Sequence, residues 1–286
     1  MSQQEKIMPL SEFSLIDFVE LVNEIFKDYV VPINWNVLTF KMDARENSLS
    51  FSDSFVFLKG DKPVGFVLVG IRGRRARIDA MGVVENERGK GLAERILRHS
   101  MHHLKLKNVE TLVLEVASSD ARAVKFYDKN GFRRVRNLYT MVLRTPSNVV
   151  SERINVSFIE SESKAVYSMA LGIEINQSRK PNWQREPISL LLADGRYHYV
   201  RIHYDGQDGY LVWGRNDDGT TFIVDCAGTS HDWTELVRLV VEFIVEQTHT
   251  NLISVVAVPE DDKLCQALKN VGFEVVLTQY EMVRQL

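Results

Sequence analysis

Apolar positions in the first half of the chain alternate between helical and extended spacing. An apolar stripe with a period near 3.6 residues predicts a first helix, and it is formed by Leu15, Phe18, Val19, Val22, Ile25 and Phe26. Short apolar runs without that period predict strands. The expected elements are, in order, a helix at 14–28, strands at 55–59, 64–71 and 76–84, a helix that starts near Gly89, a strand at 112–116, a helix at 120–129 and a strand at 134–143. This order predicts a mixed α/β domain in which helices cover a central sheet.

The second half of the chain repeats much of this order. Its expected elements are strands at 188–194, 197–204, 209–213 and 220–226, a helix at 233–247, a strand at 252–258, a helix at 261–270 and a strand at 274–283. A constant shift of 141 residues, without a gap, aligns Asp120–Val142 with Asp261–Val283 and Leu112–Val116 with Ile253–Ala257. Identical residues fall on Asp120, Gly131, Phe132, Tyr139, Met141 and Val142. This match favours an internal duplication over a chance similarity of two α/β patterns.

Turn-forming residues lie between the two copies, at Thr145-Pro146-Ser147-Asn148. We therefore expect a first domain at residues 1–145 and a second at 151–286. A chain of 286 residues is long enough for two ordinary domains, because single cores rarely grow beyond ~250–300 residues.

Composition excludes several classes of protein. Hydrophobic residues make up 45% and charged residues 26% of the chain, which is typical of a globular protein. A net charge of −3 gives no general attraction to nucleic acid or to an anionic membrane. No apolar run is long enough to span a bilayer, and the first residues lack the layout of a signal peptide. The only cysteines are Cys226 and Cys265, so we expect free thiols and a cytoplasmic location. From the charge and the apolar runs, we expect no nucleic-acid or membrane partner.

The segment from Met81 to Ala93 carries the clearest chemical signal. A strand ends, a short basic loop with Gly89 and Gly91 follows, and an amphipathic helix begins at once. Glycine allows backbone N–H groups to approach an anion closely. A helix N-terminus adds unpaired N–H donors and about half a positive charge. The segment therefore predicts a binding loop for a pyrophosphate, although it is neither a Walker loop nor a complete dinucleotide motif.

The loop Arg88-x-x-Gly91-x-Ala93 resembles the Arg/Gln-x-x-Gly-x-Gly/Ala signature of GNAT-type N-acetyltransferases, which binds the pyrophosphate of coenzyme A. That family also carries the run Asn-x-x-Ala-x-x-hydrophobic-Tyr-x-x-x-Gly-Phe on its next strand–helix unit. The corresponding residues here are Asp120, Ala123, Phe126, Tyr127, Gly131 and Phe132. Asp120 stands where the family usually has Asn, and either residue can cap a helix. The resemblance covers residues 8–144 and implies a GNAT fold for the first half.

The resemblance also implies roles for residues of the first half. Backbone groups of Met81, Gly82 and Val83 are expected to pair with the pantetheine arm, with Asp120 contacting the cofactor nearby. The pyrophosphate is expected to lie on the main-chain N–H groups of Arg88, Gly89, Lys90, Gly91, Leu92 and Ala93. Tyr127 is expected to protonate the departing thiolate as a general acid, because a phenol stays protonated at neutral pH. The alternative for Tyr127 is a packing role on an amphipathic helix.

An amine acceptor must lose a proton, so a base is also expected. Asp79 and Glu115 are the candidates, since both lie on predicted strands beside the site; Glu115 could instead be a strand-end carboxylate without a catalytic role. The cluster Arg72, Arg74, Arg75 and Arg77 is interpreted as the solvated edge of a hairpin, with contacts to the cofactor phosphates as the alternative.

His99 and His103 lie four residues apart on a predicted helix, as metal ligands can. No third ligand is evident in the sequence, and the segment is polar there. We therefore interpret the two histidines as part of a solvated face and expect no metal.

The second copy lacks the residues that carry the chemistry. At the shift of 141, Tyr127 corresponds to Leu268 and Glu115 to Val256. The segment Ala227–Asp232, which precedes the predicted helix at 233–247, has no Arg-x-x-Gly-x-Gly/Ala pattern. We therefore expect two tandem GNAT-like domains, of which the second is degenerate and does not bind coenzyme A.

The predicted function is an N-acetyltransferase that uses acetyl-CoA as co-substrate and acetylates a primary amine of a small molecule or peptide by direct attack. A non-catalytic acyl-CoA-binding or regulatory module is the alternative. The resemblance also implies that the segment Phe26-Lys27-Asp28-Tyr29-Val30-Val31-Pro32 helps to wall the acceptor site. Nothing in the sequence selects the acceptor, and the oligomeric state stays open, a homodimer included.

Overall fold

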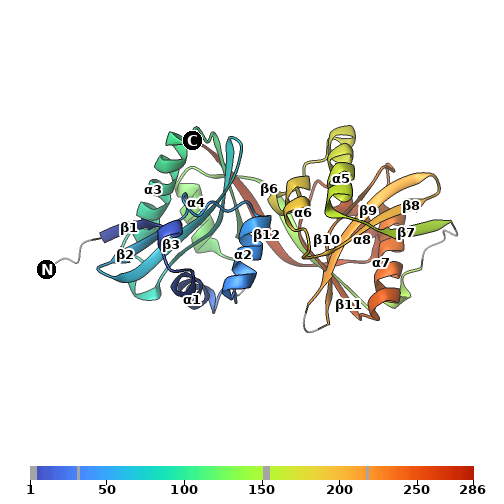
Figure 1. The fold of residues 1–286 in the computed structure, drawn as a ribbon, viewed down its shortest axis with the longest axis horizontal. Helices are drawn as coiled ribbons and strands as arrows, with labels where there is room; N and C mark the ends of the chain where they lie inside the picture. The colour runs from blue at the N-terminus through green and yellow to red at the C-terminus, as the bar shows by residue number, and fades with distance from the viewer. Residues whose placement is uncertain (1–4, 31–32, 151–154, 217–218) are drawn as a thin grey trace. The chain divides into compact units, whose positions relative to one another are not determined.

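The protein is a mixed α/β structure in which helices lie on the faces of β-strands in each half of the chain (Figure 1). The structure is a computed structural model that describes residues 5–30, 33–150, 155–216 and 219–286. The chain divides into a first unit, Met1–Val135 with Glu281–Leu286, and a second unit, Arg136–Tyr280. The mixed α/β fold expected from the sequence is therefore confirmed in both halves. Within the described ranges, every helix is too short or too polar to span a bilayer.

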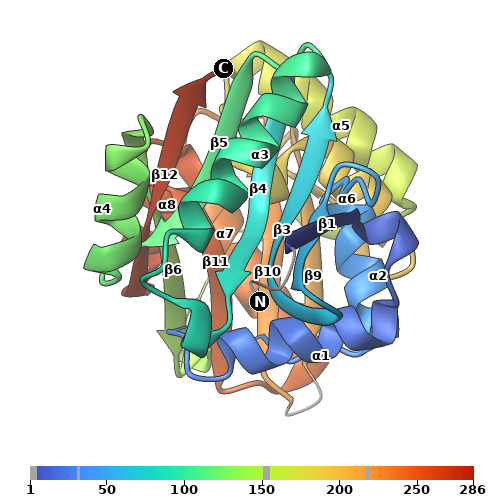
Figure 2. The ribbon, with the colours of Figure 1, turned by 90° about the vertical axis from the view of Figure 1, so that its left-hand side faces the viewer.

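The first unit is built on strands in the order β1-β2-β3-β4-β5, with the end of the last strand of the chain, β12, next to β5 (Figure 2). Neighbours are antiparallel from β1 to β4, whereas β4 and β5 are parallel. The elements of this unit are β1 (Glu5–Pro9), α1 (Leu15–Phe26), α2 (Val37–Glu46), β2 (Phe55–Lys59), β3 (Lys62–Arg72), β4 (Arg75–Val83), α3 (Leu92–Leu106), β5 (Thr111–Ala117) and α4 (Ala121–Lys129).

Helices α1 and α3 cover opposite faces of this sheet. A Cβ atom at Gly65 would lie 2.8 Å from the Ile96 side chain of α3, so β3 and α3 are in close contact there. A Cβ atom at Gly82 on β4 would lie 2.6 Å from the Ile25 side chain of α1. Phe66 follows Gly65 in β3, pairs with Gly82, and packs on Phe18 of α1 at 5.3 Å. Because successive strand residues point to opposite faces, α1 and α3 lie on either side of the sheet.

Strands β4 and β5 stay together for only four residue pairs. Their parallel pairing joins Arg75–Ile78 to Thr111–Leu114 and then ends. At that point β4 also contains a β-bulge towards β3, in which Asp79 is the extra residue. A bulge bends its strand, so β4 turns away from β5 beyond Ile78. Among the residues that the structure describes, the backbone of Met81–Val83 consequently has no strand partner on the β5 side.

The second unit repeats the same order with strands β7-β8-β9-β10-β11-β6. Its pairs are antiparallel except for β10 and β11, which are parallel. The elements are β6 (Arg133–Arg144), β7 (Val156–Glu160), α5 (Ser163–Gln177), α6 (Pro187–Leu192), β8 (His198–Tyr204), β9 (Gln207–Arg215), β10 (Thr221–Gly228), α7 (Thr234–Thr248), β11 (Leu252–Pro259), α8 (Lys263–Val271) and β12 (Glu274–Gln285).

The two units exchange their last strands. Most of β6 belongs to the second unit, where it pairs with β11, whereas Glu281–Leu286 of β12 belong to the first. In the first unit, the backbone N–H of Leu286 donates to the carbonyl of Glu110 at 2.9 Å, and the Arg284 side chain donates to the carbonyl of Asn130. The compact units therefore divide at 135/136 and 280/281, whereas the sequence placed the division between residues 145 and 151.

Three elements of the second half differ from the sequence-based expectation, and one of them is strand β7, which was not predicted. The segment predicted as a strand at 188–194 is helix α6, with Pro187 at its first position, where the fixed φ of proline favours a helix start. Its apolar run is short enough to suit either a strand or a helix. Helix α5 was not predicted. In the first half, α2 was also missed, although Asn36 and Thr39 form a capping box at its start.

The exchanged strand gives a prediction for a chain that ends at Tyr280. Removing Glu281–Leu286 deletes the buried Met282 and the hydrogen bonds to Glu110 and Asn130. We expect a loss of about 3 kcal/mol in the stability of the first unit, measured from the denaturation midpoint in urea. An unchanged midpoint would mean that these residues contribute nothing to the first sheet.

Candidate active site

A cavity of about 410 Å³ lies where β4 and β5 have separated. Its walls come from the end of α1, the end of β4, the start of α3 and the start of α4. The lining residues are Ile25, Phe26, Tyr29, Met81, Gly82, Val83, Glu87, Arg88, Gly89, Gly91, Leu92, Ala93, Glu94, Asp120, Arg122, Ala123, Phe126 and Tyr127. The structure therefore brings together in one cavity all the residues expected to bind coenzyme A except Lys90.

Backbone donors without partners line the loop side of this cavity. Gly89 and Gly91 both have φ of +77°, a left-handed conformation that other residues rarely adopt. Gly91 is the N-cap of α3, and no side chain caps this helix end. Within the described residues, nothing accepts a hydrogen bond from the backbone N–H groups of 89–94. Such a helix start fits an anion with several oxygens, as in a pyrophosphate.

The side chains of this loop stabilise its shape. Arg88 donates from Nε to the carbonyl of Val83 at 3.0 Å, so its guanidinium ties the loop to the end of β4. Lys90 is exposed and lies 3.4 Å from Glu87. Glu87 also pairs with Lys59 at 3.0 Å. The anion-binding character of the loop therefore rests on its backbone more than on its basic side chains.

Tyr127 reaches the cavity from α4, whose N-cap is Asp120. Its ring packs on Phe126 and Phe132 with centroids 5.2 and 5.6 Å away. Burial raises the pKa of Tyr127 above its ordinary value, and the neighbouring Tyr29 and Asp120 add to this shift. The phenol therefore carries its proton at neutral and moderately alkaline pH.

The two candidate bases lie at the point where the strands separate, but neither lines the cavity. Both are ion-paired to Arg77, Asp79 at 2.8 Å and Glu115 at 3.3 Å. Arg77 is only 5% exposed, so the expectation that it belongs to a solvated hairpin edge is wrong. Burial raises the pKa of Asp79, and the Arg77 charge offsets part of that shift. These groups form a buried ionic cluster that ties β4 to β5.

Tyr29 lines the cavity together with Phe26, and both belong to the segment 26–32 that was expected to wall the acceptor site; residues 31–32 lie outside the described residues. Tyr29 follows α1, and its ring packs on Phe26 at 5.3 Å. Burial raises the pKa of its phenol, and the charge of Asp120 adds to this shift.

The corresponding separation of strands in the second unit is bridged by a side chain. Parallel pairing of β10 with β11 ends at Ile223 and Val255, and Val224 is the bulged residue. Val255 corresponds to Leu114 at the shift of 141, so both sheets divide at the same place. The guanidinium of Arg185 donates to the carbonyls of Val224 and Val256 and so bridges the two strands.

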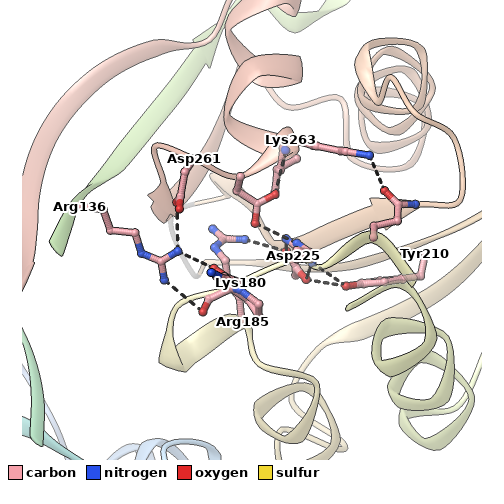
Figure 3. Close-up of polar contacts among 12 residues, drawn as sticks. Arg136, Lys180, Arg185, Tyr210, Asp225, Asp261 and Lys263 are labelled. Carbon is pink, nitrogen blue, oxygen red and sulfur yellow. Dashed lines mark hydrogen bonds and ion pairs between the residues drawn. The ribbon is translucent and has the colours of Figure 1, made fainter. Parts of the chain in front are cut away.

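A buried ionic cluster surrounds this bridge (Figure 3). Arg179 binds both carboxylate oxygens of Asp225 at 2.8 Å and donates to Asp262 at 2.9 Å. Tyr210 donates to Asp225 at 2.7 Å. Burial alone would raise the pKa of Asp225, but the Arg179 charge, helped by Arg185 and Tyr210, holds it below its usual value. Side chains of the second unit thus bridge its own pair of separated strands. A pocket of about 300 Å³ at the end of α5 and the starts of α7 and α8 is polar, and it is lined by Gln177, Ser178, Arg179, Lys180, Trp233, Asp261, Asp262 and Lys263.

The two histidines of α3 pack on an aromatic ring. His99 and His103 lie edge-on to Phe55, with ring centroids 4.6 and 4.9 Å away, so they do not form the fully solvated face that was expected. His103 Nε2 also lies 2.7 Å from Asp53. Across the described ranges, no three His, Cys, Asp or Glu side chains gather closely enough to hold a metal ion.

Comparison with known proteins agrees with the fold and the loop. Residues 18–132 match the model of the acetyltransferase (GNAT) family. N-alpha-acetyltransferase 30 of Schizosaccharomyces pombe is 32% identical over 95 residues, which cover 32% of this chain and 63% of that protein. The chain therefore matches less than two thirds of this relative's length. An N-alpha-acetyltransferase of Saccharolobus solfataricus is 27% identical over 136 residues, covering 43% of this chain and 77% of that protein.

Among solved structures, a tandem GNAT protein from the clavulanic acid biosynthesis pathway is similar over the whole chain. The TM-score is 0.70 at 13% identity, with 99% of this chain and 98% of the other covered. At this identity the likeness concerns the fold. This likeness confirms the expected fold, in which two GNAT-like domains follow each other along the chain.

The ionic cluster of the second unit gives a stability prediction. In Arg179→Met, the fully buried Asp225 loses its bidentate partner, and breaking a buried ion pair costs about 3–5 kcal/mol. Arg238→Met is the matched control, since it removes a half-exposed pair with Glu235 in the same unit and is expected to cost less than about 1 kcal/mol. Urea denaturation measures the free energy of unfolding of both variants. Equal losses would show that the buried cluster stabilises the unit no more than the half-exposed pair does.

Proposed function

Because residues 18–132 of this chain match the model of the acetyltransferase (GNAT) family, we propose that the protein transfers the acetyl group of acetyl-CoA to a primary amine. The observation that carries this proposal is the uncapped start of α3 with its two left-handed glycines, facing a cavity between separated strands. A diphosphate needs such donors, and an extended pantetheine arm needs an unpaired strand edge.

Binding is divided among the cavity walls. The backbone N–H groups of 89–94 hold the pyrophosphate at the positive end of the α3 dipole. The free edge of Met81–Val83 pairs with the amides of the pantetheine arm, as an added strand would. The absence of a side chain at Gly82 allows α1 to approach β4 closely, so that Ile25 and Phe26 cover the arm from that face.

Transfer is a direct attack. The amine nitrogen attacks the thioester carbonyl, the carbon–sulfur bond breaks, and the sulfur leaves as a thiolate that takes a proton from Tyr127. Holding both reactants in one cavity lowers the entropic part of the barrier. A phenol with a raised pKa is fully protonated before the reaction, so its proton is present when the thiolate leaves.

The curated relatives guide the choice of acceptor. Both are named N-alpha-acetyltransferases, and this name supports an amine, with the α-amino group of a peptide as the first acceptor to test. An alternative is a non-catalytic acyl-CoA-binding module. It is disfavoured by the position of Tyr127 in the cavity, which binding alone does not require.

Calorimetry of acetyl-CoA binding tests the site. We expect one site per chain for the wild type and none for Gly91→Glu, because the added carboxylate lies where the pyrophosphate binds and the left-handed backbone disfavours a side chain. Gly73→Glu is the matched control: Gly73 also has a positive φ, but it lies in the β3–β4 turn with open space around it. Equal affinities of Gly91→Glu and wild type would refute the assignment of the loop.

Replacement of Tyr127 by Phe separates an enzyme from a binding module. We expect kcat to fall about 10²–10⁴-fold, the usual contribution of a general acid, while the Kd for acetyl-CoA stays within a few-fold. Release of free thiol from acetyl-CoA in the presence of a peptide amine measures the rate. An unaltered kcat would remove Tyr127 from the chemistry.

A further inference from the structure

The second unit keeps a pocket at the place that corresponds to the cavity of the first. This polar pocket of about 300 Å³ lies at the end of α5 and the starts of α7 and α8, just as the end of α1 and the starts of α3 and α4 line the first cavity. Three of its residues correspond, at the shift of 141, to residues that line that cavity. The pairs are Leu92 with Trp233, Asp120 with Asp261, and Arg122 with Lys263.

The carboxylates of this pocket already have guanidinium partners (Figure 3). Arg179 donates from Nε to the buried Asp262 at 2.9 Å and also binds Asp225. Arg136 pairs with Asp261 at 3.0 Å. These three carboxylates are balanced by three guanidinium groups, those of Arg136, Arg179 and Arg185.

The two lysines of the pocket have no partner of opposite charge. Lys263 donates from Nζ to the neutral amide oxygen of Gln177 at 2.8 Å, and Nζ lies 5.9 Å from the centre of the Trp233 ring. Lys180 is exposed. In the described part of the chain, no carboxylate lies within ion-pair distance of either ammonium group. The side chains that line the pocket therefore leave two positive charges unbalanced.

The ammonium group of Lys263 is held in position. Gln177, which accepts its hydrogen bond, donates from Nε2 to the backbone carbonyl of Gly228 at 2.7 Å. An ammonium group has three N–H donors, so Lys263 has donors left for a ligand. A charge that is fixed beforehand loses less conformational freedom on binding than a mobile one.

We propose that this pocket binds a small dianion through Lys263 and Lys180. A ligand with two negative charges, on carboxylate or phosphate groups, balances the two ammonium groups. Acetyl-CoA is not this ligand, because its pantetheine arm needs a free strand edge, and in this unit Arg185 bridges the separated strands. The duplicated site has thus changed its ligand from a nucleotide thioester to a small anion.

Calorimetry with two probes, inorganic phosphate and succinate, tests the pocket at a mildly alkaline pH at which both are dianions. The titrations use the full chain with Gly91→Glu, so that phosphate cannot bind at the start of α3. We expect one site per chain for at least one probe, and the probe that binds identifies the acidic group. Lys263→Met and Lys180→Met should each weaken binding about tenfold or more. Lys263→Arg, which keeps the charge, should stay within a few-fold.

Two further variants separate this site from general attraction to the protein. Asp261→Asn removes a negative charge from the pocket and should strengthen anion binding several-fold. Lys164→Met is the matched control, because Lys164 is exposed at the other end of α5, and it should leave the affinity unchanged.

Urea denaturation without ligand checks that the lysine variants remain folded, and the exposed Lys180 gives a second reading should Lys263→Met lower the midpoint. No binding of either probe would overturn the proposal. So would equal losses in Lys180→Met and Lys164→Met, or weaker binding in Asp261→Asn. None of these results bears on the proposed function, because the loop of the first unit is blocked in every titration.

Discussion

The separation of β4 from β5 after four residue pairs is the constraint on which the site depends. Parallel strands that continued together would satisfy each other's backbone groups and leave no room between them. The bulge at Asp79 and the end of pairing at Leu114 occur together, and Arg77 ties the two strands at this point through its ion pairs with Asp79 and Glu115. Beyond it, the free edge of β4, the start of α3 and the start of α4 all face one cavity.

The second unit shows the same constraint met in another way. Its strands β10 and β11 separate at the corresponding pair, and a bulge lies at the corresponding residue of β10. There Arg185 donates to the carbonyls of Val224 and Val256, which the separated strands leave without a strand partner, and Arg179 forms an ion pair with the buried Asp225. Backbone groups of a divided sheet need partners; in the first unit a ligand can supply them, and in the second the chain does so itself.

Apolar periodicity predicted most of the helices and strands, and the glycine loop predicted the part of the cavity formed by residues 88–93. The glycines at 89 and 91 before an amphipathic run located the helix start, and the shift of 141 residues located its degenerate copy. The strand exchange could not be predicted, because β6 and β12 are copies of each other and either would fit either sheet. Nor could the burial of Arg77, Arg179 and Arg185, since each has a carboxylate partner in a different element, at Glu115 for Arg77 and at Asp225 for the other two.

The most direct test of this account is a crystal structure of the protein with acetyl-CoA. We expect the pantetheine arm beside Met81–Val83, the pyrophosphate on the backbone of residues 89–94, and the thioester within reach of Tyr127. In the second unit, Arg185 should still bridge Val224 and Val256. Acetyl-CoA bound between β10 and β11, or bound away from the α3 start, would contradict the central claim that the first separation of strands is the site and the second is bridged by Arg185.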